Sequence, residues 1–146
     1  MRLMAFDFGL KRVGVAVSDE IPIIASPVGY VENNERLYDE IKKLLDQYKP
    51  ARLVVGNPIN MDGTPGKNTG LVKQFGDTLK ECMAGAEVVY WDERLSSMQA
   101  EKMLIKGDVR RDKRKGMIDK ISAAIILQNY MDFLKHAGNR TDGQQQ

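Results

Sequence analysis

Residues 3–17 read LMAFDFGLKRVGVAV, and this stretch decides the fold. Two apolar runs, residues 2–8 and 12–18, flank a short turn marked by glycine. The spacing predicts an antiparallel hairpin of two strands. Asp7 interrupts the first run where a central strand would be buried, and a carboxylate there is costly unless it is paired, hydrogen-bonded or bound to a metal ion. The partner of Asp7 is therefore the first functional question.

The remainder of the chain alternates strand and helix patterns. Pro22 and Pro27 give the third predicted strand, residues 21–31, a bent or edge character. Asn33 or Asn34 could cap the helix that follows and runs to Tyr48. The apolar positions of this helix form one face, namely Leu37, Ile41, Leu44, Leu45 and Tyr48. The further predicted elements are a strand at 53–55, a helix at 68–83, a strand at 88–91, a helix capped by Ser96 or Ser97, and a helix at 117–135. This order predicts an α/β fold, a mixed sheet covered by helices.

Length and composition predict one soluble globular domain. The chain has 146 residues, 42% hydrophobic and 29% charged, so we expect a single domain over residues 1–136 and a polar, disordered tail over 137–146. No apolar run approaches the roughly 20 residues that span a bilayer. With no export signal either, we expect a cytoplasmic protein without membrane contact.

The scarcity of Cys and His narrows the possible chemistry. Cys82 is the only cysteine, which excludes an internal disulfide and a cysteine zinc cluster. His136 is the only histidine and argues against histidine zinc sites and a serine–histidine triad. We expect Cys82 to be inert packing and Trp91 to pack between sheet and helix. Chemistry must then rest on carboxylates, lysines and arginines.

Basic charge is concentrated in one segment. Residues 106–120 carry seven Lys and Arg against three Asp, a local charge of +4 in a chain of net charge +2. Such a concentration suits contact with a phosphate backbone. A solvated loop would show the same pattern, so both interpretations stay open at this point.

Carboxylates break or end three of the apolar elements. Asp7 lies in the first strand, Asp92 and Glu93 follow the strand at 88–91, and Asp119 lies in the first turns of the last helix. Parallel strands present their carboxyl ends along one edge of a sheet, where α/β folds build sites. Carboxylates converging there would bind Mg²⁺ or Mn²⁺. Two such ions about 4 Å apart could activate a water and stabilise a leaving oxygen.

Each carboxylate also has a purely structural interpretation. Asp7 could pair with Lys11 or Arg12, Asp119 could favour the positive end of a helix dipole, and Glu93 could be a surface residue. Taken together and beside a basic segment, the carboxylates favour a metal site.

Four blocks of sequence in order resemble a known family. From residue 1 to about 135 the chain is similar to the YqgF/RuvX family of Holliday junction resolvases, which is also associated with pre-16S rRNA processing. The resemblance rests on DFG at 7–9 with RVGVA at 12–16, VVGNP at 54–58 with NMDG at 60–63, DERLSS at 92–97, and DK at 119–120 with AAIIL at 123–127.

The resemblance implies an RNase H-like fold with sheet order 3-2-1-4-5 and an antiparallel second strand. It also implies phosphodiester hydrolysis with a carboxylate-bound divalent metal. By motif position, Asp7, Glu93 and Asp119 inherit the catalytic and metal-ligand roles. Arg12 and Arg94 would be site arginines, and the substrate-contacting loop would include Arg110, Arg111, Lys113, Arg114 and Lys115.

The implied strand order separates the first and fifth strands by about 9–10 Å. Glu93 must therefore reach inward from its loop, or another carboxylate such as Asp62 or Asp92 must serve in its place.

The leading functional hypothesis is a metal-dependent nuclease for structured nucleic acid, with Mg²⁺ or Mn²⁺ as cofactor. Its first substrate candidate is the 5′ end of pre-16S rRNA, and branched DNA of the Holliday junction type is the second. A nucleic-acid-binding factor with little catalysis is an alternative, as is an ATP-using enzyme of the actin–hexokinase type. We expect a monomer or a homodimer.

Overall fold

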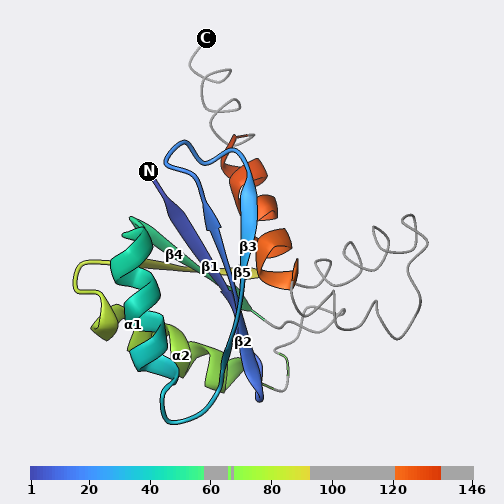
Figure 1. The fold of residues 1–146 in the computed structure, drawn as a ribbon. Coiled ribbons are helices and arrows are strands. Elements are labelled where there is room, and N and C mark those ends of the chain that lie inside the picture. The colour runs from blue at the N-terminus through green and yellow to red at the C-terminus, as the bar shows by residue number, and fades with distance from the viewer. Residues whose placement is uncertain (58–65, 67, 93–120, 136–146) are drawn as a thin grey trace.

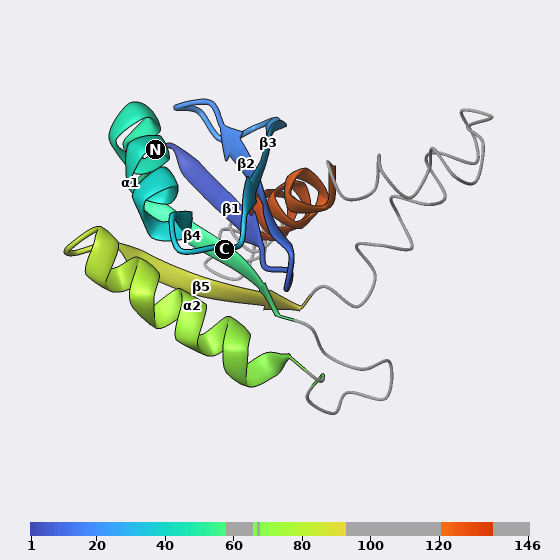
Figure 2. The same cartoon turned by 60° about the horizontal axis from the view of Figure 1, so that its bottom comes forward.

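The computed structural model describes residues 1–57, 66, 68–92 and 121–135, which form a five-stranded sheet with helices on both faces (Figures 1 and 2). The strands are β1 (Leu3–Asp7), β2 (Arg12–Ser18), β3 (Ala25–Glu32), β4 (Arg52–Asn57) and β5 (Glu87–Asp92). The helices are α1 (Leu37–Tyr48), α2 (Thr69–Cys82) and the helical residues 121–135.

The sheet order is β3-β2-β1-β4-β5. Strand β2 is antiparallel to both β1 and β3, whereas β1, β4 and β5 are parallel to one another. These pairings confirm the predicted hairpin, the mixed sheet and the order 3-2-1-4-5. Strand β1 is thereby the central strand, and its residues 3–6 are fully buried.

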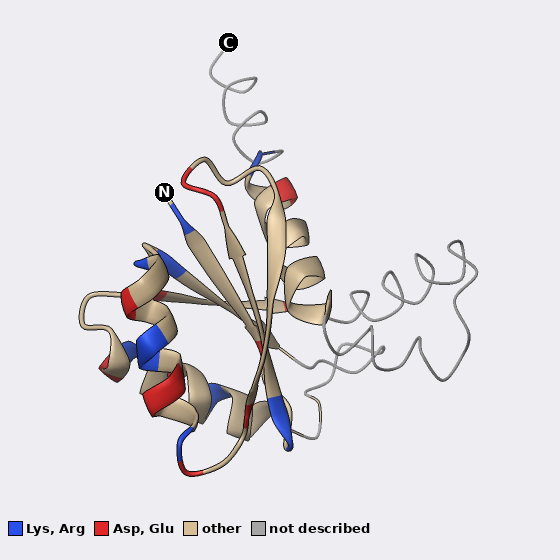
Figure 3. Ribbon diagram, viewed as in Figure 1, with Lys and Arg blue, Asp and Glu red and all other residues tan. Residues whose placement is uncertain are grey.

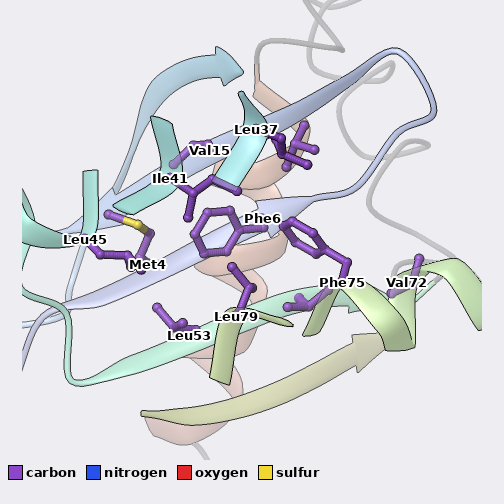
Figure 4. Packing of buried hydrophobic residues seen from close by; sticks show 12 residues of the cluster. Met4, Phe6, Val15, Leu37, Ile41, Leu45, Leu53, Val72, Phe75 and Leu79 are labelled. Atoms are coloured by element: carbon purple, nitrogen blue, oxygen red, sulfur yellow. The ribbon is translucent and has the colours of Figure 1, made fainter. Parts of the chain in front are cut away.

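Alternation along β1 divides the core between the two faces of the sheet. Met4 and Phe6 pack under α1 and α2, where Phe6 and Phe75 meet edge to face with ring centroids 5.7 Å apart (Figure 4). The apolar positions of α1 that the sequence aligned on one face supply the buried Leu37, Ile41 and Leu45. The predicted helical periodicity of this segment is therefore confirmed.

Leu3 and Ala5 point to the opposite face, which the helix at 121–135 covers. Trp91 of β5 lies against that helix, with its ring centroid 5.7 Å from that of Tyr130 and 5.3 Å from that of Phe133. The expectation that Trp91 packs between sheet and helix is confirmed. Burial raises the pKa of the Cys82 thiol, which fits its expected role in packing.

Two predicted boundaries were wrong, and long-range hydrogen bonds explain the first. Strand β3 begins at Ala25 and not at residue 21, because the side-chain amide of Gln128 binds this segment. Its oxygen accepts from the Ala25 N–H at 3.0 Å, and its nitrogen donates to the Ile23 carbonyl at 3.0 Å. The backbone of residues 23–25 is thus tied to the last helix.

The second boundary error concerns the start of α1. The helix begins at Leu37, three residues beyond Asn34, and Arg36 occupies its N-cap position without a side-chain bond. Asn34 closes the preceding turn, since its side-chain oxygen accepts from the Arg36 N–H at 2.9 Å and its carbonyl accepts from the Leu37 N–H at 3.1 Å. Asn33 has a different partner, described below.

Several expectations fall outside the described residues: the helix capped by Ser96 or Ser97, the start of the last helix at 117, and the tail at 137–146. Within the ranges that the structure describes, no helix is long and apolar enough to cross a bilayer.

Gly76 of α2 provides a test of the packing between α2 and β5. A Cβ atom at residue 76 would overlap the Tyr90 hydroxyl and lie 2.7 Å from Tyr90 Cζ. We predict that Gly76→Ala lowers the free energy of unfolding by about 1–3 kcal/mol. In a Tyr90→Val background the same change should instead raise it by up to about 1 kcal/mol, because only the better helix propensity of alanine remains. Urea unfolding of the wild type, the two single variants and the double variant measures the change in the free energy of unfolding in each background. A loss of stability on Gly76→Ala in both backgrounds would contradict the close contact between Gly76 and Tyr90.

Candidate active site

Asp7 lies at the carboxyl end of the central strand. It is half-buried, unlike the four fully buried residues before it. By strand alternation it shares the face of Leu3 and Ala5, which is the face that the helix at 121–135 covers. The expectation that Asp7 lies in the buried part of the strand was wrong, because Asp7 marks where that part ends and the strand reaches the surface.

A pocket of about 440 Å³ opens at this end of the sheet. It is formed by the carboxyl end of β1, the β1–β2 turn, the start of β2 and the residue before α2. Its lining residues are Asp7, Gly9, Leu10, Lys11, Arg12, Gly14 and Asn68. The start of β2 is basic (Figure 3), so a carboxylate and two cationic side chains share one pocket. The purely structural interpretation, in which Asp7 forms an ion pair with Lys11 or Arg12, involves the same three side chains.

The β1–β2 turn is held in place from β3. Asn33 donates from its side-chain nitrogen to the Gly9 carbonyl at 2.8 Å, and its backbone N–H donates to the Lys11 carbonyl at 3.0 Å. Gly9 is required because a Cβ atom there would lie 2.5 Å from the Arg12 carbonyl oxygen. The shape of the pocket rim therefore depends on a glycine and on an asparagine that the sequence analysis assigned to helix capping.

Arg12 extends from the start of β2 toward β3. Its guanidinium carbon lies 5.0 Å from the ring centroid of Tyr30, a cation–π distance. Arg12 is exposed and belongs to the pocket lining. Arg12 therefore lines the same pocket as Asp7, and its role as a site arginine stays a prediction.

Asp92 lies on the other side of the sheet. It ends β5 in register with Asn57 of β4. Val88 and Tyr90 pack with the α1–α2 core, whereas Val89 and Trp91 pack with the helix at 121–135. Alternation therefore assigns Asp92 to the α1–α2 face, away from Asp7. This geometry argues against Asp92 as a co-ligand of Asp7.

The other predicted site residues lie outside the described residues. These are Glu93, Asp119, Asp62, Arg94, Arg110, Arg111, Lys113, Arg114 and Lys115. Among the described residues, no group of three or more acidic, histidine or cysteine side chains is placed to hold a metal ion. Asp7 and Arg12 are thus the predicted site residues that the structure brings together.

The described part of the pocket suits a hard divalent cation in one respect. Asp7 supplies carboxylate oxygens, the ligand type that Mg²⁺ and Mn²⁺ prefer, at an accessible edge of the sheet. Asn68 also lines the pocket. Sequence alone does not point to Asn68, because it precedes α2 and is far from Asp7 in the chain.

Comparison with known proteins identifies the family of the chain. The family model described as "RuvX: Holliday junction resolvase" matches residues 1–133. A protein of Bacillus cereus strain B4264 named "Putative pre-16S rRNA nuclease" is 44% identical over 136 residues, which cover 90% of this chain and 98% of that protein. A protein of the same name from Carboxydothermus hydrogenoformans is 42% identical over 135 residues, covering 91% and 97% of the two chains.

Solved structures agree with the fold. Thermus thermophilus RuvC in complex with a Holliday junction substrate matches with a TM-score of 0.54 at 15% identity, covering 90% of this chain and 96% of that one. The Fowlpox virus resolvase with Holliday junction DNA matches with a TM-score of 0.52 at 14% identity, covering 92% and 99%. These likenesses show a common RNase H-like fold, and the sequence matches decide the family. The chain belongs to the RuvX family of Holliday junction resolvases.

Proposed function

We propose that this protein is a divalent-metal-dependent nuclease that hydrolyses phosphodiester bonds in structured nucleic acid. The observation that carries the proposal is the half-buried Asp7 at the carboxyl end of the central strand, in a pocket with Lys11 and Arg12. Membership of the RuvX family and the names of its relatives at 42–44% identity support the reaction class.

Asp7, Glu93 and Asp119 would together hold Mg²⁺ or Mn²⁺. Strand alternation assigns Asp92 to the α1–α2 face, so Asp92 is the less suited of the two adjacent carboxylates. Asp119 precedes by two residues the helical segment that covers the face of Asp7. Both arguments favour Glu93 and Asp119 over Asp92.

A divalent ion bound there would polarise the phosphate and lower the pKa of a bound water. The task of the chain itself is to hold and orient the substrate. Arg12 would bind a phosphate oxygen through its planar guanidinium, and Lys11 would add a positive charge at the pocket rim. Asn33 fixes the turn that contains Lys11 and leads to Arg12, so both cations keep their position relative to Asp7.

The first substrate candidate is the 5′ end of pre-16S rRNA. The relatives at 42–44% identity carry the name "Putative pre-16S rRNA nuclease", and the matches cover 97–98% of their length. Holliday junction DNA is the second, because the matched family model is described by that activity. Cleavage by the pure protein of a pre-16S RNA fragment and of a four-way DNA junction, each with Mg²⁺ or Mn²⁺, distinguishes the two.

Asp7→Asn tests the role of the central carboxylate. Asparagine keeps the shape and loses the charge, so we expect cleavage to fall by at least about 100-fold, since loss of a residue that merely supports a metal ligand already costs 10–100-fold. The thermal midpoint should stay close to that of the wild type.

Asp46→Asn, at an exposed position of α1, is the matched control and should cleave normally. Equal cleavage by wild type and Asp7→Asn would refute the mechanism. A large drop in thermal midpoint with normal cleavage would identify Asp7 as a structural anion.

The basic segment provides a second test, through the salt dependence of binding. Replacing Arg110, Arg111, Lys113, Arg114 and Lys115 by glutamine should flatten the plot of log K against log salt. The slope should fall by about 0.7 for each lost contact to a single strand. A control variant with Lys42→Gln and Lys43→Gln on exposed positions of α1 should keep the wild-type slope. An unchanged slope in the first variant would show that the segment does not contact nucleic acid.

The binding-factor alternative makes the opposite prediction for catalysis. It expects salt-sensitive binding that survives Asp7→Asn together with no cleavage of either substrate by the wild type. The same two assays therefore decide between a nuclease and a binding factor.

A further inference from the structure

Tyr30 lies in the same row of the sheet as Asp7. Asp7 of β1 pairs with Gly14 of β2, and Gly14 pairs with Tyr30 of β3. Directly paired residues on neighbouring strands project to the same face. Tyr30 therefore stands on the face of Asp7, two strands away, which corresponds to about 9–10 Å.

Gly14 is the residue between them, and it contributes no side chain. It also lines the pocket that contains Asp7. No β2 side chain therefore stands between the carboxylate and the tyrosine ring along this row. The buried core that the helix at 121–135 covers lies farther along the strands, at Leu3, Ala5 and Ala16.

The Tyr30 ring is exposed and has a cation beside it. Tyr30 is 43% exposed although it belongs to a strand of the sheet, and the guanidinium of Arg12 lies 5.0 Å from its ring centroid. An accessible aromatic ring beside an arginine is the combination on which unpaired nucleobases stack, because each base has a π-face and the arginine holds the neighbouring phosphate.

We propose that Tyr30 and Arg12 form a stacking platform for an unpaired nucleobase of the substrate, near the phosphate that Asp7 faces. This inference rests on the proposed nuclease function and adds to it a substrate requirement, namely an unstacked base next to the scissile phosphate. Arg12 supplies the phosphate contact, and Tyr30 supplies the sequence-tolerant contact with the base.

The experiment measures the affinity of a labelled RNA spanning the 5′ end of mature 16S rRNA, with Asp7→Asn protein so that the RNA stays intact. We expect Tyr30→Leu to weaken binding by about 5- to 100-fold, whereas Tyr30→Phe stays within about twofold because the ring is kept. Phe133→Leu is the matched control, since Phe133 is also an exposed aromatic residue, at 54%, and lies on the helix beside Trp91. It should leave the affinity unchanged.

A set of RNAs that each lack one base locates the contact. At one position, removal of the base should lower the affinity of protein that has Tyr30 by the same factor as the Tyr30→Leu substitution does. Removal of that base should leave the affinity of the Tyr30→Leu variant unchanged. Equal losses in both proteins at every position would overturn the platform, as would unchanged affinity in Tyr30→Leu.

Salt dependence separates stacking from an indirect effect through Arg12. Arg12→Gln should reduce the slope of log K against log salt by about 0.7, while Tyr30→Leu should lower the affinity at every salt concentration with the slope unchanged. A reduced slope in Tyr30→Leu would mean that Tyr30 only positions Arg12, which overturns base stacking.

The failure of the platform and the failure of the nuclease function are distinguishable. If the wild type cleaves RNA and the Tyr30→Leu variant binds RNA normally, only the platform is refuted. Tyr30-dependent binding without any wild-type cleavage would refute the nuclease function alone.

Discussion

The structure depends on the burial of one short strand from both sides. Strand β1 has neighbours on either edge and helices over either face, so its residues 3–6 lose all contact with solvent. Its alternation assigns Met4 and Phe6 to one core and Leu3 and Ala5 to the other. The strand ends at Asp7, where the apolar contacts stop. The same alternation that fills the two cores thus fixes which face the carboxylate is on.

The sequence predicted those features that local pattern controls. The apolar runs on either side of a short turn specified the β1–β2 hairpin, and helical periodicity specified the buried face of α1. The order of elements predicted a mixed sheet, and the family resemblance implied its strand order. Local pattern failed where a side chain bonds to a distant backbone. Gln128 binds residues more than a hundred positions earlier and shifts the start of β3.

The candidate site shows the same division. Arg12 was implied by the family resemblance, and it lines one pocket with Asp7. Asp7 could be selected from sequence because it interrupts an apolar run. Asn33 could not, because its bond to the Gly9 carbonyl spans 24 residues and its type also suits a helix cap. The face on which Asp92 lies could not be predicted from sequence either, because it depends on which residues of β5 pack against each of the two cores.

Pro27 has a consequence for the behaviour of the protein in concentrated solution. Strand β3 is an edge of the sheet, and its outer backbone could pair with a strand from another molecule. Pro27 carries no N–H group, and the β2–β3 register shifts at Val15/Ala16, close to where Pro27 pairs. A regular ladder of hydrogen bonds along this edge is therefore interrupted. An edge interrupted in this way is a poor template for the open-ended addition of strands from other molecules.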